Sequence, residues 1–219
     1  MTFCTCLFSG ANTGIGKVTA LDMSKRGAKV IILCRNQEKA KEAANEISAE
    51  TGGVVTHEKL DLASLASVRE CAKNLLEKEE KIDILINNAG VMNCPNWKTE
   101  DGFDMQLGTN HLGHFLLTEL LMPLMKESVA SGFHPRSCIA LLIHFKLNSS
   151  LKHLRRIVIV SSMAHTAGSM HWDDLNWDKS YSRITAYCQS KLANVLHAKE
   201  LARRLENTNI SVYSLHPGK

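Results

Sequence analysis

The chain has 219 residues, of which 44% are hydrophobic and 22% are charged. This size and composition indicate one globular domain that can bury a sizeable core. The net charge is +4 with both signs interspersed, which gives no indication of a nucleic-acid partner. No apolar run reaches the ~18 residues that a membrane span needs, and the first residues lack the basic start and apolar core of a signal peptide.

Cysteine and histidine usage gives no sign of a metal site. None of the seven cysteines forms a C-x-x-C pair, and the ten histidines show no H-x-x-E-H spacing. We therefore expect buried free thiols and a reducing compartment, either the cytoplasm or the periphery of an intracellular membrane. The cysteines are Cys4, Cys6, Cys34, Cys71, Cys94, Cys138 and Cys188.

Buried-strand patterns alternate with helical patterns along the whole chain. This alternation predicts an α/β fold with a doubly wound, Rossmann-like parallel sheet. Asn36 and Ser64 or Ala63 stand where helices begin, and Gly52 stands where one ends. The predicted strands are residues 2–8, 28–34, 54–60, 82–86, 157–160 and 210–215, and the predicted helices are residues 17–26, 38–50, 64–80, 104–126 and 184–206.

A glycine-rich turn follows the first predicted strand. Ser9-Gly10-Ala11-Asn12-Thr13-Gly14-Ile15-Gly16 leads directly into a helical run. Glycines allow a tight turn and close approach of the backbone to a pyrophosphate, and a helix start offers free N–H groups. Strand, glycine turn and helix together predict a dinucleotide-binding site, although the spacing G-x-x-x-G-x-G differs from the commoner G-x-G-x-x-G.

Arg35 directly follows the second predicted strand. In a dinucleotide fold this strand end meets the adenosine ribose, where an acidic residue accepts the 2′-hydroxyl and an Arg suits a 2′-phosphate. Because Cys34 and Arg35 occupy the position and no acid does, NADP(H) is favoured. The alternative is an Arg that only faces solvent.

Polar residues follow the other predicted strands as well. Asp61 and Leu62 follow the third strand, Asn87-Asn88-Ala89-Gly90 the fourth, and Ser161-Ser162 the fifth. Ligands of such sheets bind beyond the carboxyl ends of the strands. We therefore expect these residues to surround one site.

Tyr187 and Lys191 stand four residues apart in the last predicted helix. This spacing places both side chains on one helix face. A phenol alone is a poor acid or base at neutral pH, but a neighbouring ammonium favours the phenolate. The pair therefore suits proton transfer in carbonyl and alcohol chemistry. The same spacing also occurs on ordinary helix surfaces, so it gains meaning from the strand-end residues.

Taken together, these motifs resemble the short-chain dehydrogenase/reductase superfamily. The segments that begin at Gly10, Leu85, Asn110 and Ala186 are similar to the NADP-dependent retinol dehydrogenase (retinal reductase) group. The resemblance covers nearly the whole chain except about residues 128–155.

The resemblance implies a role for each matching residue. Tyr187 would be the acid/base, Lys191 would hold the nicotinamide ribose and favour the Tyr187 phenolate, and Ser162 would bind the substrate oxygen. Asn110 would anchor a water in a proton relay that reaches Lys191. The implied cofactor-binding residues are Gly10, Asn12, Thr13, Gly14, Ile15, Gly16, Arg35, Asp61, Leu62, Asn88, Ala89, Gly90, Tyr187, Lys191, Pro217 and Gly218.

Two stretches depart from the family pattern. Residues 128–155 stand where the family has a short connection, so they represent either a surface excursion or an annotation error. The chain also ends at Lys219, where the family continues with substrate-lining helices and a seventh strand. The expected domain is therefore a single NADP-binding unit of six strands that lacks the seventh strand, and the family's N-terminal membrane anchor is also missing.

The predicted function is that of an NADP(H)-dependent oxidoreductase that interconverts an apolar, retinoid-like alcohol and its aldehyde. The alternative is a truncated, catalytically incompetent nucleotide-binding remnant or the product of an erroneous gene model. Met92, Met163, Met170 and Trp172 follow site strands and either line an apolar substrate pocket or fill the core. The last helix has a second apolar side, which would allow a homodimer.

Overall fold

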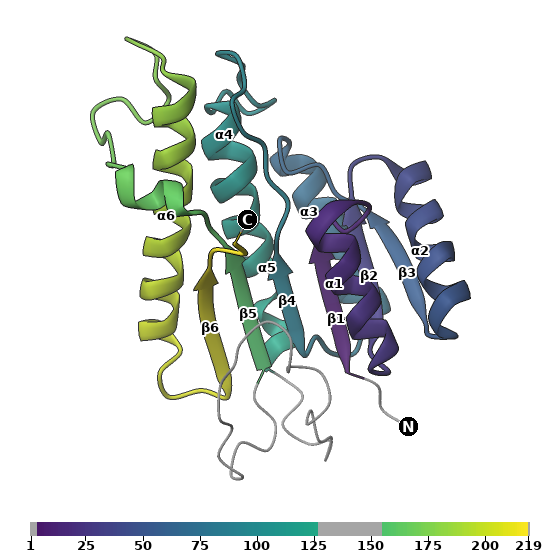
Figure 1. Cartoon of the computed structure of the whole chain (residues 1–219). Helices are drawn as coiled ribbons and strands as arrows, with labels where there is room; N and C mark the ends of the chain where they lie inside the picture. The colour runs from purple at the N-terminus through teal and green to yellow at the C-terminus, as the bar shows by residue number, and fades with distance from the viewer. Residues whose placement is uncertain (1–3, 127–154, 219) are drawn as a thin grey trace.

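The computed structural model describes residues 4–126 and 155–218. Figure 1 shows a single sheet with helices on both faces. Its strands are β1 (Thr5–Ser9), β2 (Lys29–Cys34), β3 (Val55–Lys59), β4 (Ile84–Asn87), β5 (Arg155–Val160) and β6 (Ile210–Leu215). The helices are α1 (Gly14–Lys25), α2 (Gln37–Thr51), α3 (Leu65–Lys78), α4 (Met105–Leu107), the π-helical η1 (Gly108–Leu112), α5 (Gly113–Lys126), the 3₁₀-helical η2 (Met163–Ala167) and α6 (Arg183–Arg204).

The strand order is β3-β2-β1-β4-β5-β6, and every pair is parallel. The chain builds outward from β1 in one direction and then returns to start β4 on the other side of it. The ends of β1 and β4 therefore form the crevice where such a sheet binds its ligand. The predicted doubly wound parallel sheet is confirmed.

Two separate cores cover the two faces of the sheet. The row Ile31, Leu7, Leu85 and Ile157 runs in register across four strands and belongs to the core beneath α3, α5 and α6. The alternate row, which includes Phe8 and Ile86, packs against α1 and α2. Because side chains alternate along a strand, strands buried on both faces read as continuous apolar runs.

Most of the predicted helix boundaries agree with the structure within a few residues. Asn36 caps α2 by accepting a hydrogen bond from the Lys39 N–H at 3.0 Å, and Gly52 ends that helix with φ +68°. Ser64 caps α3 in the same way. The first helix begins at Gly14 rather than at residue 17.

The predicted helical run of residues 104–126 is confirmed, but it contains a π-helical turn that the sequence does not predict. The run begins as α4, widens into the π-helical turn η1 and only then continues as α5. A π turn closes i→i+5 hydrogen bonds and is frequent at functional sites. Asn110, the candidate site residue of this run, lies within the turn.

Several expectations concern residues outside the described part of the chain. The atypical stretch 128–155 lies there, except for Arg155, which begins β5. The described cysteines are all buried, and none of them is in a disulfide: Cys4, Cys6, Cys34, Cys71, Cys94 and Cys188. None of the described helices combines the length and the apolar character required to cross a membrane.

Candidate active site

A groove of about 450 Å³ opens at the carboxyl ends of β1, β2, β3 and β4. It brings together most of the residues that the sequence assigned to cofactor binding. Those that line it are Gly10, Asn12, Thr13, Ile15, Gly16, Arg35, Asp61, Leu62, Asn88, Ala89 and Gly90. The predicted residues that lie outside this lining are Gly14, Tyr187, Lys191, Pro217 and Gly218. Pro217 instead borders a smaller cavity beside Ile15 and Gly16.

The glycines of the turn are required by close backbone contacts. A Cβ on Gly10 would lie 2.8 Å from the Ala89 Cβ, and Gly10 has φ +68°. A Cβ on Gly16 would lie 2.5 Å from the Gly10 carbonyl oxygen and 2.7 Å from the Asn88 amide nitrogen. Larger residues would therefore push β1, α1 and β4 apart and disrupt the wall of the groove.

The start of α1 differs from the starts of the other long helices. Asn36, Ser64 and Ser182 cap α2, α3 and α6 with their side chains, whereas Thr13 makes no capping hydrogen bond to α1. The first-turn N–H groups of α1 can therefore donate hydrogen bonds to an acceptor other than the Thr13 side chain. A helix start with free donors at a glycine turn suits an anion such as a pyrophosphate.

Arg35 and Asp61 lie at the β2–β3 side of the groove. Arg35 is exposed, and no described carboxylate pairs with it. The Asp61 carboxylate accepts a hydrogen bond from the Ala63 N–H at 2.9 Å, which fixes the loop before α3. The cation is thus available to a ligand, while the acid is partly occupied by its own loop.

Ser9 and Asn88 join the ends of β1 and β4. The Ser9 hydroxyl accepts hydrogen bonds from the N–H groups of Asn88 at 2.9 Å and Ala89 at 3.0 Å. The Asn88 side chain donates to the carbonyl oxygens of Ser9 at 2.9 Å and Gly10 at 3.2 Å. These bonds hold residues 88–90 as one wall of the groove.

Asn110 connects this wall to α6. Its side-chain oxygen accepts from the Val91 N–H at 2.7 Å, and its amide donates to the Val91 carbonyl and to the Ser190 hydroxyl, both at 2.9 Å. Asn110 is fully buried, so its side chain is committed to fixing the backbone. The predicted role in a water relay is not tested by these contacts.

Lys191 reaches the inner end of the groove from α6. A Cβ on Gly90 would lie 3.4 Å from the Lys191 ammonium and 3.2 Å from the Asn110 side-chain oxygen. The ammonium lies 5.7 Å from the Tyr187 ring centroid and donates to the Val160 carbonyl at 3.2 Å. Burial without a described carboxylate partner lowers the pKa of Lys191 to about 8.

The structure separates the two serines that follow β5. Ser161 is buried, and its hydroxyl donates to the Lys191 carbonyl at 2.8 Å, which anchors α6. Ser162 is only half buried and begins η2, where its hydroxyl accepts from the Ala164 N–H at 3.3 Å. Ser162 therefore keeps a hydroxyl proton that it can donate to a ligand.

Sequence reasoning did not find several polar residues that hold the site together. Ser190 and Gln189, between Tyr187 and Lys191, bind Asn110 and the Leu175 carbonyl. Asn194 donates to the Val160 carbonyl at 3.1 Å, next to the Lys191 ammonium. These contacts join residues that are distant in sequence, so no local pattern predicts them.

Comparison with known sequences identifies the family. A model described as short chain dehydrogenase matches residues 5–132, and the chain belongs to this family. Over 98% of its length the chain is 50% identical to retinol dehydrogenase 13 of Homo sapiens and 45% identical to retinol dehydrogenase 14 of Mus musculus. It spans 58% and 60% of these two relatives. The resemblance inferred from the motifs is confirmed.

Solved structures agree with this assignment. An uncharacterized protein from Mycobacterium Paratuberculosis is 40% identical, with a TM-score of 0.78 over 98% of this chain and 68% of that one. The Pseudomonas aeruginosa RhlG/NADP active-site complex is 25% identical, with a TM-score of 0.72 over 99% of this chain and 71% of that one.

Buried histidines make stability depend on pH. Burial lowers the pKa of His114 to about 3 and of His197 to about 4. The unfolded chain therefore binds more protons than the folded chain below pH ~6.5, so stability falls as the pH is lowered. Between pH 6.5 and 5, we expect each of these histidines to remove up to about 2 kcal/mol from the free energy of unfolding.

Chemical denaturation of the wild-type chain and His197→Phe would test this expectation. The variant should lose less stability than the wild type between pH 6.5 and 5, because one titrating group is gone. A comparison at pH 8, where His197 is neutral in both states, isolates the packing effect of the substitution. Equal pH slopes for the two proteins would contradict the assignment.

Proposed function

We propose that the chain forms the nucleotide-binding and proton-transfer part of an NADP(H)-dependent oxidoreductase that interconverts an apolar, retinoid-like alcohol and its aldehyde. The observation that carries the proposal is the buried Lys191 ammonium at the inner end of the groove, on the same helix face as Tyr187. The substrate class rests on the curated relatives, which are named retinol dehydrogenases.

The groove fits a nicotinamide dinucleotide in three respects. The first-turn N–H groups of α1 suit the pyrophosphate, and the close packing at Gly10 and Gly16 holds the glycine turn against Ala89 and Asn88. The exposed Arg35 guanidinium suits a ribose 2′-phosphate. The inner end, at Gly90 and Lys191, suits the nicotinamide ribose.

The residues of the chain would divide the remaining work. When bound, the nicotinamide supplies a hydride acceptor or donor. Lys191 would donate hydrogen bonds to the ribose and place a positive charge beside Tyr187. The Tyr187 hydroxyl would give a proton to the substrate oxygen during reduction and take it back during oxidation. Ser162 would donate a hydrogen bond to the same oxygen and so fix its position.

Arg35 provides a test of cofactor choice. A charge-assisted hydrogen bond contributes roughly 1.5–3 kcal/mol, so NADPH should bind at least about tenfold tighter than NADH. Arg35→Asp should reverse this preference, because an acid accepts the ribose 2′-hydroxyl and repels a 2′-phosphate. Calorimetric titration with both cofactors measures it.

Arg69→Asp is the matched control, since Arg69 is an exposed residue of α3 outside the groove lining. It applies the same change of charge and should leave the preference for NADPH intact. Equal affinity of the wild-type chain for NADPH and NADH would refute this choice of cofactor.

Tyr187 provides a test of the chemistry. Tyr187→Phe should bind NADPH as the wild type does and lose about 10²–10⁴ in kcat, because it lacks only the phenolic proton. The assay is NADPH consumption with a panel of aldehydes that includes all-trans-retinal. Tyr213→Phe, on β6, removes a phenol elsewhere and should keep the wild-type rate.

Two results would contradict the proposal. Near-normal turnover of Tyr187→Phe would remove Tyr187 from the proton-transfer step. Tight NADPH binding by a wild-type chain that reduces no aldehyde would favour the alternative, a nucleotide-binding protein without turnover.

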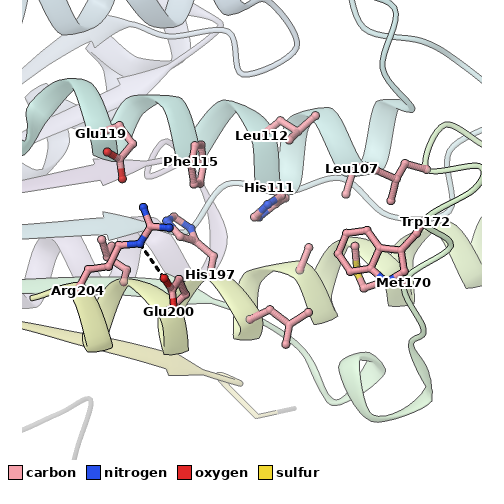
Figure 2. A pocket seen from close by; sticks show the side chains of 14 residues that line it. Leu107, His111, Leu112, Phe115, Glu119, Met170, Trp172, His197, Glu200 and Arg204 are labelled. Carbon is pink, nitrogen blue, oxygen red and sulfur yellow. Dashed lines mark hydrogen bonds and ion pairs between the residues drawn. The ribbon is translucent and has the colours of Figure 1, made fainter.

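A second, apolar groove of about 350 Å³ runs between α5 and α6. Figure 2 shows Phe115 and His197 facing each other across it, with Met170 and Trp172 at one end and Glu119, Glu200 and Arg204 at the other. Phe115 is 43% exposed and Leu196 is 42% exposed. We propose that a second copy of the chain covers this face, because it would remove Phe115 and Leu196 from water. A two-fold axis would also bring Glu119, which has no described ion-pair partner, toward the Glu200–Arg204 pair of the other copy.

The dimer proposal predicts the mass of the particle in solution. Leu196→Glu should shift the chain from dimer to monomer in analytical ultracentrifugation, because the carboxylate would be buried without a partner. Leu76→Glu is the control, since Leu76 is 41% exposed on α3, away from this groove. A wild-type chain that stays monomeric at all tested concentrations would refute the dimer.

A further inference from the structure

His114 connects two parts of the cofactor groove without lining it. It lies on α5, is 1% exposed and uses both ring nitrogens. Nδ1 lies 3.1 Å from the Asn110 carbonyl oxygen, and Nε2 lies 2.7 Å from the Ser9 hydroxyl oxygen. Because a carbonyl oxygen can only accept, Nδ1 carries the proton and Nε2 accepts the hydroxyl hydrogen of Ser9.

The bond to Ser9 fixes the direction in which that hydroxyl acts. A serine hydroxyl has one hydrogen and two lone pairs. With its hydrogen given to His114, the Ser9 oxygen presents its lone pairs to the N–H groups of Asn88 and Ala89. His114 therefore orients the residue that holds the beginning of the groove wall.

The bond to Asn110 acts at the other end of the same wall. The Asn110 side chain holds Val91 by two hydrogen bonds and reaches Ser190, the neighbour of Lys191. Residues 88–91 are thus held by Ser9 at one end and Asn110 at the other. His114 is the side chain that joins these two holders.

We propose that His114 is a positioning residue that braces wall 88–91 of the cofactor groove against the helix that carries Tyr187 and Lys191. The proposal rests on the function proposed above, since it assigns His114 a part in holding the cofactor and the proton-transfer pair in register. His114 itself touches neither cofactor nor substrate.

Burial and charge favour this use of a histidine. The ring is fully enclosed, and the groups that act on it electrostatically are Lys191, His111 and His197. Burial lowers the pKa of His114 to about 3, so the ring stays neutral at physiological pH and Nε2 remains an acceptor. A buried side chain with both polar atoms bonded rigidifies its surroundings.

Two substitutions of His114, called half-variants below, each keep only one of its two hydrogen bonds. The amide of His114→Asn can replace Nδ1 and keep the bond to Asn110, whereas the amide of His114→Gln can replace Nε2 and keep the bond to Ser9. Neither keeps both. His57→Phe is the matched control, because His57 is a half-buried histidine on the edge strand β3, bonded to Gln37.

The measurements use the whole chain below the melting temperature of every variant. Both half-variants should weaken NADPH binding and lower kcat roughly ten- to a hundredfold, the order of loss expected from misplaced reacting groups. His114→Asn should also speed amide hydrogen exchange at Asn88 and Ala89, because their acceptor Ser9 is no longer oriented. His114→Gln should instead speed exchange at Val91, because its acceptor Asn110 has lost the bond to residue 114. His57→Phe should change none of these values.

The outcomes separate the brace from the proposed function. Wild-type exchange rates and wild-type NADPH affinity in both half-variants would overturn the brace. Wild-type behaviour of His114→Asn alone would also overturn it, since capping of the Asn110 turn would then suffice. If the wild-type chain reduces no aldehyde, the proposed function fails. NADPH affinity and amide exchange in the half-variants would then still decide the brace.

Discussion

The close meeting of β1 and β4 is the constraint on which the site depends. These strands are neighbours because the chain reverses its direction of building between them, and the crevice of the fold forms at that point. Gly10 lies so near Ala89 that a Cβ would not fit. The Ser9 hydroxyl and the Asn88 amide replace the missing side-chain packing with hydrogen bonds. A wider spacing here would separate the glycine turn from residues 88–91 and remove one wall of the groove.

The π-helical turn η1 is the second device that shapes this region. It lies between α4 and α5, and within it Asn110 turns its side chain toward Val91 and α6. The remainder of the run, α5, packs on the sheet with α3 and α6. One helical segment can therefore supply both a core face and a polar junction, because a π turn changes the direction of side chains locally without ending the helix.

The sequence predicts most of the fold but only part of the site. Strands with buried faces and capped helices such as α2 have local signals, and these predict the doubly wound parallel sheet; the order of its strands comes from the structure alone. Arg35, Asp61 and Asn88 were assigned to one groove because each follows a strand. Lys191 could be paired with Tyr187 by helical spacing, but its burial against Val160 could not be predicted. The Ser9–His114 bond joins residues 105 positions apart in sequence and the Asn110–Ser190 bond joins residues 80 apart, and no local pattern encodes such contacts.

The burial of Lys191 requires that α6 be held in a fixed orientation. Three consecutive residues of the helix, Gln189 to Lys191, provide this by hydrogen bonds to three different parts of the chain. A buried ammonium without a carboxylate partner is costly, so its position must be enforced by its surroundings. Gln189 holds the Leu175 carbonyl, Ser190 bonds to Asn110, and the Lys191 carbonyl accepts from Ser161. These bonds fix the rotation of α6, and with it the direction of the lysine stem. The ammonium then lies beside Gly90 rather than in solvent, and a polar ligand at that place would supply acceptors in addition to the Val160 carbonyl. The free energy lost by burying the Lys191 ammonium can therefore be offset by a ligand whose oxygens accept its hydrogen bonds.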